Sequence, residues 1–305
     1  MRAAGICQLL CLLGVLTSVP TGGHADFVST PSEAEREAFA STLLEWRVAA
    51  AAGDPEAQWQ LGNTYAVGIW VSRDNDEAYR WYRLAAEQGQ ADAQFALGMG
   101  YALGLVGLRN DSEAARWVSL AADQGHLGAQ VMLAEWYTSG QRIPRNYPEA
   151  YRLYQAIAES GHWFGEYQLA QIYAEGRGVP QDHAKAARWY RAAAEQGIPD
   201  AQLALAELYA NGQGVPRDGQ ESLHWFRRAA RQNHALAQAR LGAIYEQGID
   251  VPANLILAYK WTALAARHPA IDACEILVWL ESRLRPEELV QAKVMVAQFE
   301  PDWEI

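Results

Sequence analysis

The sequence predicts an all-α protein, a right-handed α-solenoid of six helix-turn-helix repeats with helical caps at both ends. A tyrosine recurs every 36 residues without a slip, a glycine follows each tyrosine by three positions, and a leucine precedes it by four. The six tyrosines are Tyr65, Tyr101, Tyr137, Tyr173, Tyr209 and Tyr245. A fixed period of this size without insertions is typical of a solenoid, in which each repeat packs mainly against its neighbours.

Each repeat begins with a short helix whose apolar residues share one face. In the first repeat this helix starts near Pro55, which suits a first helical position because its missing N–H is not needed there. Leu61 and Tyr65 recur at helical spacing, and Gly68 is expected to end the helix as a left-handed cap. We therefore predict a first helix of about three turns in every repeat, with the tyrosine packed between repeats.

The second helix of each repeat starts at an Asp or Asn and carries small residues. The predicted N-cap residues are Asp74, Asn110, Asn146, Asp182, Asp218 and Asn254. Glu77 and its equivalents, three residues later, predict a capping box, and a glycine such as Gly89 ends the helix. Alanines such as Ala85 allow the helix axes to approach closely, and Trp81 is expected to fill the space beside them.

The repeats and their flanks divide the chain into four parts. We predict a signal peptide over residues 1–25, an N-terminal capping helix within residues 26–54, the repeats over residues 55–270 and a C-terminal helical cap over residues 271–305. The six repeats occupy residues 55–90, 91–126, 127–162, 163–198, 199–234 and 235–270. The last helix, near residues 287–299, is expected to close the array with a more polar outer face.

The first 25 residues are typical of a secretory signal peptide. Arg2 supplies a short basic start, residues 6–19 are largely apolar, and small residues precede a predicted cleavage after Ala25. This predicts an exported protein, either periplasmic or secreted. A lipoprotein processed at Cys11 is a weaker alternative, because the bulky Leu10 before it does not fit such a site.

Composition limits the classes of partner. The chain has 25 basic and 36 acidic residues and a formal net charge of −11, which disfavours nucleic acid and anionic membrane surfaces. No stretch after the signal approaches the ~18 apolar residues of a membrane span, so no stable membrane insertion is expected. Cleavage after Ala25 would leave Cys274 as the single thiol, so stability is expected to come from stacking and not from disulfides.

Several segments resemble the Sel1-like repeat family, a relative of tetratricopeptide repeats. They are the pattern Ala57-Gln58-x-x-Leu61-Gly62-x-x-Tyr65, the Gly-Val-Pro loop at residues 178–180, and the Ala-x-x-Trp-Tyr-x-x-Ala-Ala-Glu-Gln-Gly segments at residues 78–89 and 186–197. The period of 36 and the Gly-x-Gly loop differ from ordinary tetratricopeptide repeats. The resemblance covers about residues 40–300. It implies an α-solenoid with a concave, ligand-facing surface that acts as an adaptor, and its exported bacterial members imply envelope signalling, exopolysaccharide assembly or host contact.

No motif in the sequence predicts an enzyme, a cofactor or a metal site. His126, His162 and His234 share one repeat position, but stacked helices lie about 8–10 Å apart, too far for one zinc to bind all three rings. Cys274 has no identifiable His and acid partner and is interpreted as a small core or groove residue. The resemblance also brings in a hydrolase of the β-lactam-binding repeat type. That alternative is the least favoured, because the chain lacks the paired cysteines and an S-x-x-K motif.

Positions that vary between repeats while their neighbours stay fixed are candidates for a ligand-facing wall. They fall on the first helix of each repeat, in register with residues 59, 60 and 63. The candidate partner-binding residues are Trp59, Asn63, Phe95, Met99, Met132, Glu135, Tyr167, Gln171, Glu207 and Arg240. Aromatic residues and Met are enriched in protein interfaces, so those among the candidates are expected to anchor a partner if they are exposed. The alternative is that the aromatic side chains pack against the adjacent helix.

These observations predict a non-enzymatic scaffold or adaptor in the bacterial cell envelope that binds a segment of a protein partner in a groove. A module that binds glycan or cell-wall polymer is the main alternative, because exposed aromatic residues near Asp, Glu and Gln would suit a sugar. Trp163, at the edge of a loop, is one such aromatic residue for which exposure is expected.

Overall fold

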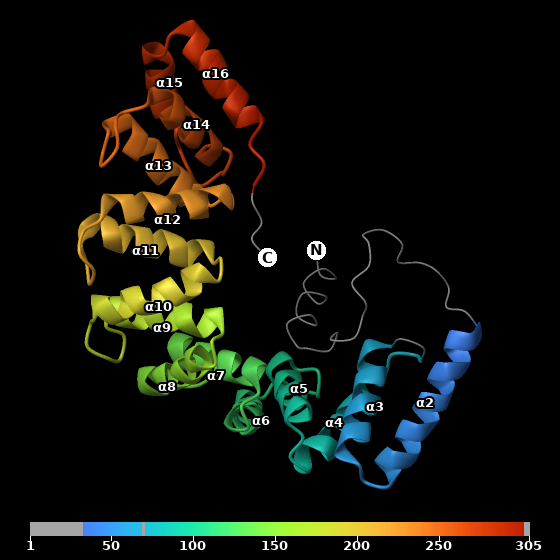
Figure 1. Cartoon of the computed structure of the whole chain (residues 1–305). Helices are drawn as coiled ribbons and strands as arrows, with labels where there is room; N and C mark the ends of the chain where they lie inside the picture. Colours follow the sequence, from blue (N-terminus) through green and yellow to red (C-terminus); the bar gives the residue numbers. More distant parts are fainter. Residues whose placement is uncertain (1–32, 69–70, 302–305) are drawn as a thin grey trace. The chain divides into compact units, whose positions relative to one another are not determined.

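The computed structural model describes residues 33–68 and 71–301, and its helices follow one another in antiparallel pairs (Figure 1). Within these residues there are 15 helices and no strands, so the fold is an all-α solenoid. None of the described helices is both long and apolar enough to cross a membrane. The predicted signal peptide and its cleavage site lie outside the described residues. The chain divides into two compact units, residues 1–153 and residues 154–305.

The first unit is a series of helices, each of which packs on the next. They are α2 (Glu33–Ala51), α3 (Pro55–Val67), α4 (Asn75–Glu87), α5 (Ala91–Leu103), α6 (Asp111–Asp123), α7 (Leu127–Ser139) and the start of α8 (Tyr147–Glu159). From α2 to α7, every helix contacts the one that follows it. Leu61 and Leu97 are fully buried, and they pack in clusters with small residues such as Ala57 and Ala85. Alanines therefore bring the backbones close enough for leucines to fill the remaining space.

The second unit continues the series and ends in two shorter helices. It contains the end of α8, α9 (Trp163–Glu175), α10 (His183–Glu195), α11 (Pro199–Asn211), α12 (Gly219–Arg231), α13 (Ala235–Gln247), α14 (Leu255–Ala265), α15 (Cys274–Arg283) and α16 (Pro286–Ala297). From α9 to α14 each helix packs on the next, and α14 also contacts both α15 and α16. Leu169, Leu205 and Leu241 occupy the buried position of Leu61.

The predicted helix ends are confirmed. Gly68 ends α3 with a φ of 74°, a left-handed conformation that is costly for residues with a Cβ atom. The equivalent glycines through Gly248 all have positive φ values. Asp74 caps α4 by accepting a hydrogen bond from the Glu77 N–H at 3.0 Å, and its equivalents cap the second helix of the other repeats.

The predicted capping box at these second helices is wrong. A capping box needs the Glu77 side chain to accept from the Asp74 N–H, but that N–H donates to the Tyr65 carbonyl at 3.0 Å. The Glu77 carboxylate instead contacts Arg80 at 3.2 Å. The same backbone bond joins the N-cap to the tyrosine carbonyl in all six repeats, so each tyrosine also fixes the start of the second helix.

The row of tyrosines lies at the junctions between repeats, as predicted. Tyr173, Tyr209 and Tyr245 of the second unit are buried, whereas the three tyrosines of the first unit are half-buried. The Tyr245 hydroxyl accepts a hydrogen bond from Arg227 on the helix before it, at 3.1 Å. A buried tyrosine ring thus keeps a polar partner for its hydroxyl.

A second aromatic position, one residue after the predicted tryptophans, is also core. Tyr82 is 5% exposed, and its ring lies so close to Gly62 that a Cβ atom there would come within 2.4 Å of it. The equivalent residues Tyr154, Tyr190 and Phe226 are buried as well. The Trp-Tyr segments at residues 81–82 and 189–190 contain this position, but its side chains vary between repeats and no core role was predicted for it.

The C-terminal cap differs from the prediction in its outer surface. Val278 on α15 and Val290 on α16 are 68% and 64% exposed, beside exposed polar residues of α16 such as Glu287 and Lys293, so the outer face of the cap is mixed in character. The two helices pack on α14 and bury little more than Leu280 and Ala292, which leaves their other apolar residues outside. Cys274 is exposed at the start of α15, which excludes the core position among the two predicted for it.

Candidate functional site

In the second unit the candidate residues lie on the first helices of successive repeats. Tyr167 and Gln171 belong to α9, Glu207 to α11 and Arg240 to α13. The Arg240 guanidinium contacts the Glu207 carboxylate at 3.1 Å, which brings two candidates together across a repeat boundary. The Gln171 amide donates to the Tyr167 hydroxyl at 3.0 Å. Burial raises the pKa of Tyr167, and the negative charge of Asp200 on α11 raises it further.

In the first unit, two candidates on α3 are engaged with the helix behind them. The Trp59 and Tyr82 rings lie 5.1 Å apart, and the Tyr82 hydroxyl donates to Asn63 Oδ1 at 2.8 Å. Trp59 and Asn63 remain half-buried, so each keeps part of its surface accessible. These residues hold α3 against α4 and can meet a partner only with their outer edges.

Two other candidates of the first unit are buried and do not belong to an accessible wall. Phe95 is 4% exposed and Met99 is 9% exposed, which corrects their placement among the partner-binding residues. The Phe95 ring packs 4.7 Å from the ring of His126, the N-cap residue of α7, the alternative foreseen for this position. Met132 is half-buried and Glu135 is exposed. Partial burial of its carboxyl group nevertheless raises the pKa of Glu135.

The histidines that share one repeat position are helix caps. His126 Nδ1 accepts from the Ala129 N–H at 3.0 Å, and its Nε2 lies 3.3 Å from the Asp92 carboxylate. The hydrogen bond from His126 lowers the pKa of Asp92. His234 caps α13 in the same way, and His162 caps α9 by accepting from the Phe164 N–H at 3.2 Å. In the part of the chain that the structure describes, no group of three His, Cys, Asp or Glu residues could hold a metal ion.

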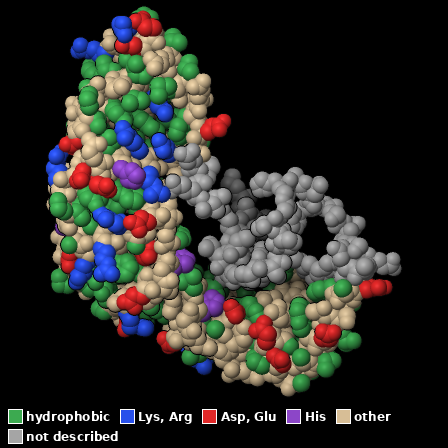
Figure 2. All heavy atoms as spheres, in the orientation of Figure 1, with side chains coloured by type: hydrophobic (Ala, Val, Ile, Leu, Met, Phe, Trp, Pro, Cys, Tyr) green, Lys and Arg blue, Asp and Glu red, His purple; other side chains and the backbone are tan. Residues whose placement is uncertain are grey.

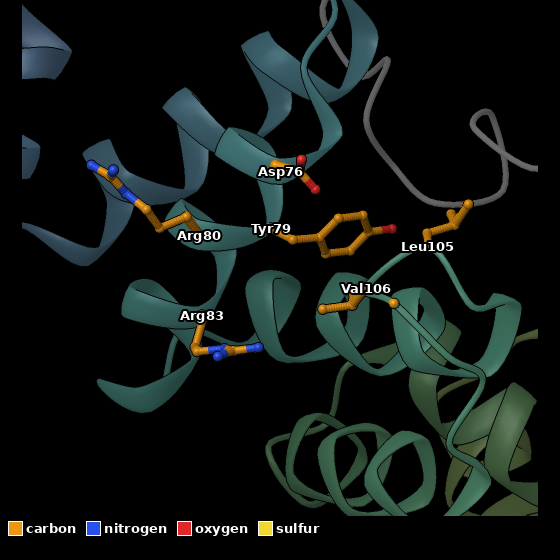
Figure 3. Close-up of a pocket in the computed structure, with 7 residues that line it drawn as sticks. Asp76, Tyr79, Arg80, Arg83, Leu105 and Val106 are labelled. Atoms are coloured by element: carbon orange, nitrogen blue, oxygen red, sulfur yellow. The ribbon is translucent and has the colours of Figure 1, made fainter.

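One pocket of about 390 Å³ lies between α4 and the loop after α5 (Figure 3). The Tyr79 ring points toward Leu105 and Val106, whereas Arg80 points away from them. Burial raises the pKa of Tyr79 to about 12, so its hydroxyl is neutral near pH 7. Arg83 already donates to a tyrosine hydroxyl on α5. The lining residues therefore offer hydrogen bonds but no activated nucleophile.

A second pocket, of about 410 Å³, lies on the second unit among α12, α14 and the segment around the end of α16. Three cations and three aromatic rings contribute to its lining, namely Arg227, Arg231, Lys260, Tyr245, Trp261 and Phe299. Figure 2 shows Lys and Arg side chains beside hydrophobic ones over this part of the molecule. The sequence reasoning missed this pocket, because its residues come from different repeat positions and from the C-terminal cap. The one available signal is Arg231 in the last turn of α12.

The Sel1 repeat family profile matches six stretches of the chain, residues 55–90, 91–126, 128–162, 163–198, 199–234 and 235–268. A solved structure of a protective antigen present in uropathogenic Escherichia coli strains, with an SLR fold, is 32% identical with a TM-score of 0.68. The match covers 85% of this chain and 56% of that antigen. A Sel1 repeat protein from Oxalobacter formigenes is 30% identical with a TM-score of 0.57, over 75% of this chain and 98% of that one. No curated protein matches the chain.

Proposed function

The chain belongs to the Sel1 repeat family, and we propose that it is a non-enzymatic scaffold that binds a segment of another protein along the first helices of its repeats. Proteins of this family generally mediate protein–protein interactions and are typically not enzymes. One observation supports the proposal most. The side chains that repeat are used in the core, whereas Gln171, Glu207 and Arg240 do not repeat and remain accessible on neighbouring helices.

The character of this surface favours a peptide segment. Tyr167 offers a partly accessible ring and a hydroxyl, and Gln171 offers an amide beside it. Glu207 and Arg240 form an exposed ion pair, which contributes little to stability and can exchange partners at small cost. Polar groups spread over several helices suit the repeated backbone amides and varied side chains of an extended protein segment.

We place this scaffold outside the cytoplasm, in the bacterial envelope. The support comes from residues 1–25, whose pattern is that of a signal peptide. The similar Escherichia coli protein is described as a protective antigen, which favours a location that antibodies can reach. Envelope signalling and exopolysaccharide assembly are the processes in which we expect the partner.

Site-specific photocrosslinking in intact bacteria tests the proposal. We would place the crosslinking amino acid at Gln171 or Glu207 in the full chain, and at exposed Arg188 on α10 as a matched control. The same protein partner should be trapped from the first two positions and not from Arg188. Tyr167→Ala should then weaken binding to that partner by about tenfold, as loss of an interface anchor does. Equal trapping from all three positions, or no partner at all, would count against the scaffold.

A glycan-binding module is the second candidate, because of one exposed ring. Trp163 is 39% exposed and stacks on His162 with ring centroids 5.7 Å apart. A fixed, exposed ring of this kind can pack against a sugar. Calorimetry with cell-wall glycan fragments separates the two functions. The scaffold predicts no heat, whereas heat that disappears in Trp163→Ala would favour the glycan.

A further inference from the structure

We infer that the pocket formed by α12, α14 and the segment around the end of α16 binds an acidic segment of a protein partner. A Glu or Asp side chain would lie against Arg231 and Lys260, and a neighbouring apolar side chain against the half-buried Leu257 and Phe299. The inference rests on the proposed function only in that the chain binds proteins. It assigns a different site and gives the chemistry of the partner.

On the apolar side of the pocket the half-buried Phe299 ring lies against the Trp261 ring, which is buried behind it at 6% exposed. Trp261 on α14 and Phe299 just after α16 meet edge to face, with ring centroids 5.9 Å apart. The Lys260 ammonium lies 4.6 Å from the centroid of the Trp261 ring and 5.8 Å from that of Phe299. Cation–π contacts of this kind hold a charged group beside the rings. Lys260 and Phe299 thus form the accessible part of this wall, and Trp261 supports both from behind.

The opposite wall is the last part of α12. Arg227 Nε donates to the Tyr245 hydroxyl at 3.1 Å, which holds this guanidinium at the edge of the pocket. Arg231 lies one turn further along the helix. Within residues 33–68 and 71–301, neither Arg231 nor Lys260 forms an ion pair, and neither does Glu300, the one carboxylate in the lining.

This arrangement of charge favours an anionic ligand. The chain has 36 acidic and 25 basic residues, yet here three cations surround one unpaired carboxylate. Burial lowers the pKa of Lys260, and the nearby charge of Arg231 lowers it further, as expected for like charges without a counter-ion. A bound carboxylate would relieve that repulsion and accept charge-assisted hydrogen bonds.

The two walls together favour a peptide over other anions. A free phosphate would contact the cations and leave the partly accessible Leu257 and Phe299 without a partner. An acidic residue beside an apolar one uses both walls, and a pocket of about 410 Å³ lies in the range of specific ligand sites, ~300–1,000 Å³. Nucleic acid is disfavoured by the net charge of −11. Complementary charge would also direct the docking of an acidic segment.

Fluorescence anisotropy on the full chain tests this site. The probe is a labelled peptide, Gly-Ser-Glu-Leu-Glu-Ser-Gly, and the control peptide carries Gln in place of both Glu residues. The acidic peptide should bind, and more weakly as salt rises. Lys260→Gln and Arg231→Gln should each raise its Kd by about tenfold or more. The control peptide should bind the native chain as weakly as the acidic peptide binds these variants.

Arg188→Gln is the matched control variant. Arg188 occupies the repeat position of Lys260 and lies over the adjacent Trp189 ring at 5.6 Å, but it is not part of the pocket. Its substitution should leave the Kd unchanged. Circular dichroism melting curves check that all variants remain folded, and Lys260→Arg, which keeps the charge, should retain most of the binding.

Four results would overturn the inference: no binding to the native chain, equal loss of binding in Arg188→Gln, equal binding of the control peptide, or stronger competition by inorganic phosphate than by unlabelled acidic peptide. Residues 302–305 are Asp-Trp-Glu-Ile, an acidic segment of this chain. If the labelled peptide binds a chain truncated after Pro301 but does not bind the full chain, residues 302–305 occupy the pocket and a partner does not. If the pocket does not bind the peptide but the crosslinker at Gln171 still traps a protein partner, the proposed scaffold function is retained and only the pocket assignment is overturned.

Discussion

Repeats four and five each join their two helices by a hydrogen bond between two side chains at equivalent positions. The pair is Glu166 and Gln196 in repeat four, but Gln202 and Gln232 in repeat five. In repeat five the buried Gln202 side chain donates to the Ala194 carbonyl at 3.1 Å and accepts from the Gln232 amide at 3.0 Å. In repeat four Glu166 replaces this glutamine and accepts from Gln196 at 2.8 Å. An ionised carboxylate has no hydrogen to donate, so repeat four loses the bond to the carbonyl of the preceding helix.

The difference shows why a glutamine recurs at this position. A primary amide can donate one hydrogen bond and accept another at the same time. In four other repeats the glutamine amide at this position also donates to a backbone carbonyl of the preceding helix, at Gln58, Gln94, Gln130 and Gln238. Glu166 is only 6% exposed. Burial raises the pKa of its carboxyl group, and nearby Glu195 contributes to the shift. Repeat four is therefore held mainly by its apolar core, and repeat five by its core and a complete pair of amides.

The largest effect is expected from removal of the repeat-four core. Tyr173→Ala should reduce the free energy of unfolding by about 3–5 kcal/mol, because the ring is buried and a cavity would remain. Urea denaturation of the full chain measures the change, and Tyr173→Phe, which keeps the ring, should lose much less. A shift near zero would show that the tyrosine row is not core.

Disruption of the amide pair in repeat five should come next. Gln202→Leu fills a similar volume but leaves the Gln232 amide without its acceptor and the Ala194 carbonyl without its second donor. We expect a loss of about 2–3 kcal/mol in the same assay. Gln213→Leu, in the exposed loop after α11, is the control and should be nearly neutral. Equal stability of the two variants would mean that the buried amides are dispensable.

Restoration of the amide in repeat four should stabilise the protein. Glu166→Gln can accept from Gln196 and also donate to the carbonyl of Ala158, which stands where Ala194 does in repeat five. The expected gain is about 1 kcal/mol, the net value of one buried hydrogen bond. Urea denaturation should show a higher midpoint with an unchanged slope. A destabilised variant would refute the comparison between the two repeats.

A smaller gain is expected in repeat six. The buried Gln238 Oε1 has no hydrogen-bond partner among the described residues, because His268 stands where repeat five has Gln232. The His268 ring instead lies 3.4 Å from Asn233 Oδ1. His268→Gln should supply the missing donor and add about 0.5–1 kcal/mol. Thermal melting compared with His268→Ala, which cannot donate, tests this directly.

The smallest effect is a dependence of stability on pH. The folded-state pKa of Glu166 is raised above its usual value of 4.5, so the native state binds more protons than the unfolded chain in that interval. Its ionised carboxylate therefore disfavours folding at neutral pH, and this penalty is lost as the pH falls from the raised value toward 4.5. Glu166→Gln should remove this part of the pH profile, whereas Glu246→Gln should not.

Much of the fold could be read from local signals. Each first helix ends at a left-handed glycine, and each second helix begins at an Asp or Asn. These residues determine the conformation and hydrogen bonds of only the few residues next to them. Their positions in the chain therefore predicted the helix boundaries. The candidate wall was harder to predict. Gln171 and Glu207 are half-buried and keep part of their surface accessible, but Phe95 is buried, because the phase of its helix brings it against His126 at the start of α7.

The sequence by itself determined the number of repeats, their period and their caps, because backbone propensity and periodicity are local properties. Only the tertiary structure decided which variable side chains stay accessible, why Glu77 pairs with Arg80 instead of closing a capping box, and where three cations meet two aromatic rings. These depend on contacts between helices whose residues lie about one repeat or more apart in the chain. Packing, charge and competition for hydrogen bonds determine these features, and a local sequence pattern does not contain that information.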